Sequence, residues 1–121
     1  MSPLLLYPDP PPPELAQSLD LAGFSWKAVA NSAIADEQSM DQEWAGAVIV
    51  ADEDPNDAFA FARSLRKKSS PQQGILILLN ATQLGQLELR DELFDDFILT
   101  PFRHQELEAR LKHLFWSQGV D

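Results

Sequence analysis

Four short apolar runs divide the chain at regular intervals. They cover residues 4–7, 47–51, 75–79 and 97–99, and polar residues or proline follow each of them. Short apolar runs without alternation are typical of strands that are buried on both faces, as in a parallel sheet covered by helices. A weaker run at residues 24–30 alternates in polarity, which predicts an edge strand. The pattern therefore indicates five strands.

Helical patterns fill the gaps between these runs. Each expected helix has apolar residues three or four positions apart, which places them on one face. Asp54 is the expected cap of the third helix, and Pro55 occupies its first turn. The expected helices cover residues 14–22, 32–45, 55 to a stop at 69–71, 83–93 and 103–116. Strands that alternate with helices predict an α/β fold, a doubly wound parallel sheet with helices on both faces. Ligands bind such sheets at the carboxyl ends of the strands.

Length and composition narrow the possible functions. The 121 residues predict one domain, and the absence of cysteine excludes disulfides and thiolate metal sites. A net charge of −10 disfavours direct contact with nucleic acid or an anionic membrane. No apolar stretch is long enough to span a bilayer, and the apolar start lacks the basic flank of a signal peptide, so we expect a cytoplasmic protein. The sequence has no nucleophile–base pair and no glycine-rich phosphate loop, so we do not expect an enzyme.

One segment near the carboxyl terminus carries a family resemblance. It reads Asp95-Asp96-Phe97-Ile98-Leu99-Thr100-Pro101-Phe102 and is followed by Glu106-Leu107 and Ala109-Arg110 in a helical stretch. This segment resembles the end of a response-regulator receiver domain (CheY-like), in the winged-helix (OmpR/PhoB-type) subfamily. The resemblance implies a five-stranded parallel sheet of the flavodoxin/CheY-like kind, with strand order 2-1-3-4-5. It also implies a cis bond between Thr100 and Pro101.

The same resemblance implies which positions would carry phosphoryl chemistry. In the family, an aspartate four residues before a loop proline accepts the phosphoryl group, and counting back from Pro55 gives Ala51. Of the acid pair that holds Mg²⁺, only Asp9 remains. The serine or threonine position is Asn80, and the lysine position is Thr100. The pocket is therefore expected to be degenerate, with no metal and no cofactor.

An alternative interpretation retains a working phosphoacceptor site. Asp52 lies one residue beyond Ala51, so a small difference in the loop would make it the acceptor. With Glu53, Asp54 and Asp9 it would then form an acidic cluster that attracts Mg²⁺. The simpler interpretation is that these are solvated loop acids and that Asp54 caps a helix.

The residues that form the dimer interface in the winged-helix subfamily are matched better than those of the phosphoacceptor pocket. Asp95, Asp96 and Arg110 match the charged residues that pair across its twofold axis, and Glu106 lies one helical turn before Arg110. Residues 63–121 carry eight acidic and eight basic residues, whereas residues 1–62 carry eleven acidic residues and one basic residue. Because the acidic half would repel its copy, we expect a homodimer through the face formed by helix 4, strand 5 and helix 5.

Together these features predict a pseudo-receiver, a phosphorylation-independent regulatory and dimerisation module of a transcriptional regulator. Residues 1–116 are the expected domain, and residues 117–121 are the expected start of a linker to a carboxyl-terminal domain that contacts DNA. Two alternatives remain open: a phosphorylatable receiver that uses Asp52 with Mg²⁺, and a stand-alone adaptor that binds a partner protein.

Overall fold

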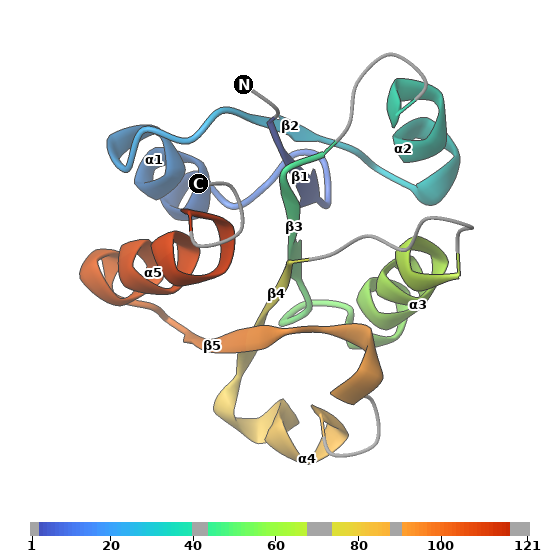
Figure 1. Ribbon diagram of the computed structural model, residues 1–121. Helices are drawn as coiled ribbons and strands as arrows, with labels where there is room; N and C mark the ends of the chain where they lie inside the picture. The colour runs from blue at the N-terminus through green and yellow to red at the C-terminus, as the bar shows by residue number, and fades with distance from the viewer. Residues whose placement is uncertain (1–2, 40–43, 68–73, 88–90, 117–121) are drawn as a thin grey trace.

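The computed structural model describes residues 3–39, 44–67, 74–87 and 91–116. Its centre is a five-stranded sheet in which every pair of neighbouring strands is parallel. The strand order is β2-β1-β3-β4-β5, as the resemblance implies (Figure 1). The strands are β1 (Leu4–Tyr7), β2 (Trp26–Ala28), β3 (Gly46–Val50), β4 (Ile75–Asn80) and β5 (Asp96–Thr100). The predicted fold class is confirmed.

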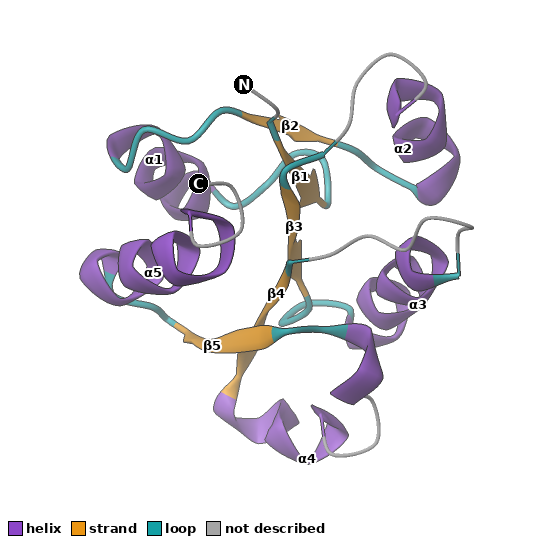
Figure 2. Cartoon of the chain, viewed as in Figure 1, coloured by secondary structure: helices purple, strands orange, loops and turns teal. Residues whose placement is uncertain are grey.

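Helices cover both faces of the sheet. Figure 2 shows α1 and α5 on one side and α2 and α3 on the other. Asp54 caps α3 by accepting a hydrogen bond from the Asp57 backbone N–H at 3.2 Å, as predicted. The Thr100–Pro101 bond is cis, which is also as expected. The bounds are α1 (Pro13–Leu21), α2 (Ser32–Ser39), α3 (Pro55–Arg66), α4 (Leu84–Leu87) and α5 (His104–Leu111).

Three helices differ from the prediction. Within the predicted helix 83–93, Gln83 ends a 3-10 turn (Ala81–Gln83), α4 is helical as far as the residues are described, and Asp91–Leu93 form a second 3-10 turn. The last helix changes from α to π geometry at Lys112–Trp116. The predicted helix over 32–45 is too long, since Trp44 and Ala45 are not helical and the Ala45 N–H bonds the Pro3 carbonyl oxygen instead. Residues 40–43, 68–73, 88–90 and 117–121, which include parts of three predicted helices and the expected linker, lie outside the described residues.

The core consists of two apolar layers, one on each face of the sheet. Alternate residues of β3 illustrate the division, since Val48 and Val50 face α1 and α5 whereas Ala47 and Ile49 face α2 and α3. Both sets are buried, which explains why the strand runs show no polar alternation. The edge strand β2 alternates as predicted, and its Lys27 is exposed. Within the described part of the chain, none of the helices has the length and apolar character needed to traverse a bilayer.

Gly46 provides a test of this packing. A Cβ atom at Gly46 would overlap the Phe115 ring and lie 2.9 Å from the Gly74 carbonyl oxygen. We expect Gly46→Ala to lower the free energy of unfolding by about 1–3 kcal/mol, because overpacking forces the backbone or the ring to move. Urea unfolding followed by tryptophan fluorescence measures this change. Gly85→Ala is the control, since nothing lies within 4 Å of its added methyl group. Equal stability of the two variants would contradict the packing described.

Candidate functional site

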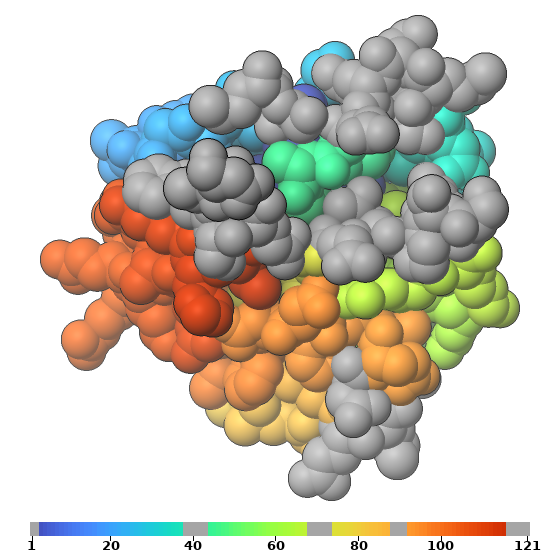
Figure 3. Space-filling model, in the orientation of Figure 1, coloured from blue at the N-terminus to red at the C-terminus, as the bar shows by residue number. Residues whose placement is uncertain are grey.

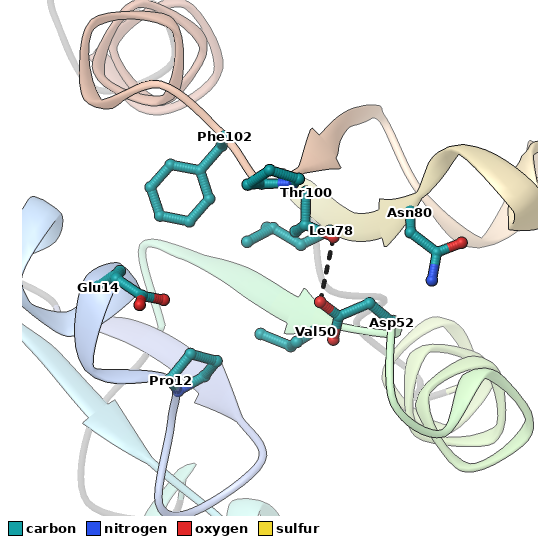
Figure 4. A pocket seen from close by; sticks show the side chains of 9 residues that line it. Pro12, Glu14, Val50, Asp52, Leu78, Asn80, Thr100 and Phe102 are labelled. Carbon is teal, nitrogen blue, oxygen red and sulfur yellow. Dashed lines mark hydrogen bonds between the residues drawn. The ribbon is translucent and has the colours of Figure 1, made fainter.

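The carboxyl ends of the strands border a cavity of about 590 Å³. Its floor is formed by the last residues of β3 and β4, and the start of α1 and the segment after β5 form its sides (Figure 4). The apolar lining residues are Pro12, Val50, Leu78, Pro101 and Phe102, and the polar ones are Glu14, Asp52, Asn80 and Thr100. Three of the five residues predicted for the degenerate pocket therefore lie together here.

Asp52 is the acidic residue that enters the cavity from the β3–α3 loop. Its side chain is half-buried, and the Thr100 hydroxyl donates a hydrogen bond to its Oδ2 atom at 3.1 Å (Figure 4). Asp52 is thus partly exposed and has a side-chain partner, whereas Glu53 and Asp54 are exposed, as expected for solvated loop acids. Successive residues of an extended segment point to opposite sides. Ala51 accordingly enters the core on the α3 side, and Asp52 turns toward the cavity.

Gln83 links the loop to the neighbouring strand. Its side-chain Nε2 donates to the carbonyl oxygens of Ala51 and Asp52 at 3.3 and 3.2 Å, and its Oε1 accepts from the Asn80 backbone N–H at 2.9 Å. Gln83 is buried, so these bonds are shielded from water. Together with the bond between Thr100 and Asp52, they connect the carboxyl ends of β3, β4 and β5.

Gln83 is absent from the predicted site residues, although the sequence contains a signal for it. The Asn80 side chain accepts from the Thr82 backbone N–H at 3.1 Å, and Gln83 returns a bond to the Asn80 backbone. This is a capping box, whose signature is a capping residue followed three positions later by glutamate or glutamine. The spacing of Asn80 and Gln83 shows that signature. The contacts of Gln83 with the β3–α3 loop have no such local signal.

The cavity and its surroundings are acidic. Glu14 and Asp52 line it, and no basic residue is among the described residues that do so. A second hollow of about 510 Å³ shares Pro12, Glu14 and Val50 with it and is also lined by Glu53, Asp54 and Asp57. There the negative charge of Asp54 raises the pKa of Asp57. Burial and these two carboxylates raise the pKa of Tyr7, which lines the same hollow.

The described residues do not fit the Mg²⁺ site that the resemblance implies for receiver domains. Mg²⁺ requires close to octahedral coordination by oxygen. Asp9 is exposed and lines neither hollow, and Asp52 is bonded to Thr100. Among the residues described, no group of three or more histidine or acidic side chains is placed to hold a metal ion.

The charged residues predicted for a dimer face separate into two groups. Arg110 on α5 bonds both carboxylate oxygens of Asp96 at 2.9 and 3.0 Å, and its Nη2 bonds Glu106 at 3.1 Å. Asp95 instead faces α3, where it pairs with Arg66 at 2.8 Å and accepts the Ile75 backbone N–H. Three of the four residues are thus adjacent, and the fourth stabilises the other side of the sheet.

Comparisons with known proteins agree with this fold. No protein-family model and no curated protein sequence matches the chain. Several solved structures are similar. The receiver domain of the TMAO respiratory system response regulator TorR has a TM-score of 0.76 and 20% identity, over 97% of this chain and 98% of that one.

Two further structures belong to sensor proteins. The receiver domain of the sensor histidine kinase PA1611 from Pseudomonas aeruginosa PAO1, with a magnesium ion in its active-site cleft, has a TM-score of 0.75 and 19% identity, over 95% of this chain and 98% of that one. A sensor protein from Polaromonas sp. JS666 has a TM-score of 0.74 and 20% identity, over 96% and 97%. At these identities the likeness is one of fold. The chain therefore has the CheY-like receiver fold.

The buried amide of Gln83 is directly testable. Gln83→Ala leaves the Asn80 N–H and two loop carbonyls without their partner, so we expect the free energy of unfolding to fall by about 1–3 kcal/mol. Gln86→Ala makes the same chemical change at a half-exposed position of α4, where we expect a change within about 0.5 kcal/mol. Urea unfolding gives both values, and hydrogen exchange should be faster at the Asn80 amide of Gln83→Ala alone. Unchanged exchange and unchanged stability in Gln83→Ala would contradict the hydrogen bonds described for Gln83.

Proposed function

We propose that this chain is a receiver-like regulatory domain that acts without phosphorylation. The observation that carries the proposal is the position of Thr100, which occupies the family's lysine position and donates its hydroxyl to Asp52. A transferring phosphoryl group needs positive charge around its oxygens. Here two carboxylates line the cavity without a basic residue among the described lining, so an additional anion is repelled. The domain carries out no catalytic step of its own.

The hydrogen bonds at the strand ends support a role that does not depend on switching. Thr100, Asp52 and Gln83 already join the carboxyl ends of β3, β4 and β5. These strand ends are therefore already connected by direct hydrogen bonds, and a phosphoryl group is not needed to connect them. A β3–α3 loop that is fixed in one conformation suits a domain whose role is to assemble a larger regulatory protein.

We further propose that the domain forms a homodimer through the face of α4, β5 and α5. Figure 3 shows the surface of α5 adjoining that of the segment around β5, and Asp96, Glu106 and Arg110 are paired where these elements meet. Arg110 and Asp96 retain partial exposure, with 34% and 24% of their side chains accessible. In a twofold interface the same residues face their copies, and carboxylates and guanidinium groups can exchange partners across the axis.

The proposed role is control of transcription in the cytoplasm, with DNA contacted by a separate carboxyl-terminal domain. This step rests on the resemblance of residues 95–111 to the winged-helix subfamily. The net charge of −10 agrees with it, because a domain this acidic does not itself approach a phosphate backbone.

A second candidate function is a divergent receiver that accepts phosphate on Asp52. The observation in its favour is that the Asp52 carboxylate faces the cavity, where the end of β3 would present an acceptor (Figure 4). Against it stand the missing cation at position 100 and the acidic lining.

Incubation with acetyl phosphate and Mg²⁺ separates the two functions. We expect no covalent adduct on the wild-type chain by intact mass spectrometry, because the cavity offers no positive charge to the phosphoryl oxygens. A phosphorylatable receiver domain treated in parallel serves as the positive control, and Asp52→Asn serves as the negative one. An adduct with the mass of one phosphoryl group that disappears in Asp52→Asn would establish the second candidate.

Charge reversal tests the dimer. Arg110→Glu places three acidic side chains together at the proposed interface, and we expect a shift from dimer to monomer in light scattering because like charges meet across the axis. Arg63→Glu reverses one charge at an exposed position of α3, away from this face, and should leave the dimer intact. Circular dichroism confirms that each variant is folded. A monomeric wild-type chain at micromolar concentration would refute the proposal.

A further inference from the structure

The cavity at the strand ends combines apolar walls with two separated carboxylates. Figure 4 shows Glu14 on α1 and Asp52 on the β3–α3 loop turned toward the same space from opposite sides. Between them lie the side chains of Val50 and Leu78, and the Phe102 ring lies on the side of Glu14. A volume of about 590 Å³ falls within the range of roughly 300–1,000 Å³ that is typical of small-molecule sites.

We propose that this cavity binds a small organic cation, a primary amine that carries an apolar or aromatic body. The ammonium group would pair with Glu14 and Asp52, and the body would lie against Val50, Leu78 and Phe102. A carboxylate has about four hydrogen-bond acceptor sites. Thr100 occupies one of those of Asp52, through Oδ2, so others remain for an ammonium donor.

The charge of the lining favours an amine over other ligands. An anion would meet two carboxylates, and a neutral ligand would leave their negative charge uncompensated. A bare metal ion would leave the five apolar lining side chains without any contact, and the described acidic residues offer it no suitable group of ligands. An aromatic ring such as Phe102 adds a favourable face for a cation.

The adjoining hollow strengthens the attraction for cations. It shares Glu14 with the cavity and is lined by three further acids, Glu53, Asp54 and Asp57. The raised pKa of Asp57, caused first by the charge of Asp54, reflects the negative potential there. A potential of one sign over a concave surface increases the local concentration of oppositely charged ligands.

This inference rests on the proposed function, because a cavity that accepts phosphoryl groups would select anions. Glu14 also has a structural explanation, since an acid in the first turn of α1 is favoured by the helix dipole. The experiment therefore has to distinguish a ligand contact from a change in helix stability, and amine binding from phosphate chemistry.

Titration of the ¹⁵N-labelled chain with 2-phenylethylamine tests the site by NMR. We expect saturable shifts at the amides of residues around the cavity, including Asp52, Thr100 and Phe102. Phenylacetate has the same ring with the opposite charge and should cause no saturable shift. Absence of saturation with the amine at millimolar concentration, or equal binding of phenylacetate, would overturn the inference.

Three variants assign the contact to the two carboxylates. Asp52→Asn and Glu14→Gln should each weaken binding of 2-phenylethylamine roughly tenfold, as expected for the loss of a charged hydrogen bond. Glu53→Gln removes the same charge from an exposed neighbour that lines only the second hollow, and its affinity should stay within about twofold. Thermal melting shows whether each variant is folded. Equal weakening by all three variants would mean general charge attraction and would overturn the site.

The two hypotheses fail in different ways. If the amine does not bind and acetyl phosphate still leaves no adduct, the ligand site is wrong and the proposed function stands. A phosphoryl adduct on Asp52 would refute both.

Discussion

Burial of β1, β3 and β4 on both faces is the constraint on which the rest of this structure depends. Continuous apolar strands leave no polar face for water, so helices cover the sheet on each side, and the helices that connect successive strands make those strands parallel. Parallel strands bring their carboxyl ends to one edge. Asp52, Asn80 and Thr100 meet there although they are far apart in the chain, and the cavity between them follows from that arrangement.

At this edge of the sheet, neutral hydrogen-bond donors contact the β3–α3 loop, and a positively charged side chain is not among the described residues that line the cavity. Thr100 offers a neutral hydroxyl to Asp52 where the receiver resemblance implies a cation, and the buried amide of Gln83 links the loop to β4. Neutral donors satisfy a carboxylate without attracting an additional anion, so the cavity remains negatively charged. The same negative charge supports two proposals, a role that does not depend on phosphorylation and an affinity for an organic cation.

Most of the fold was predictable because its signals are local. Strand runs of three to five apolar residues agree with the observed strands to within a few residues, and Pro55 after a capping Asp54 marks the start of α3 correctly. The segment around α4 was not predictable in the same way. Its leucines suit one continuous helix, but the described residues on either side of α4, Ala81–Gln83 and Asp91–Leu93, form 3-10 turns.

The sequence by itself determined the alternation of strands and helices, the two-sided core, and the acidic, lysine-free character of the candidate site. Only the tertiary structure decided which residue of the β3–α3 loop enters the cavity. Counting from Pro55 indicated Ala51, whereas the loop, held by Gln83, buries that methyl group and presents Asp52. The pairing of Asp95 with Arg66 rather than with α5 was decided in the same way. Periodicity records the side to which a residue points within an element, but the direction of a loop side chain depends on contacts between distant segments.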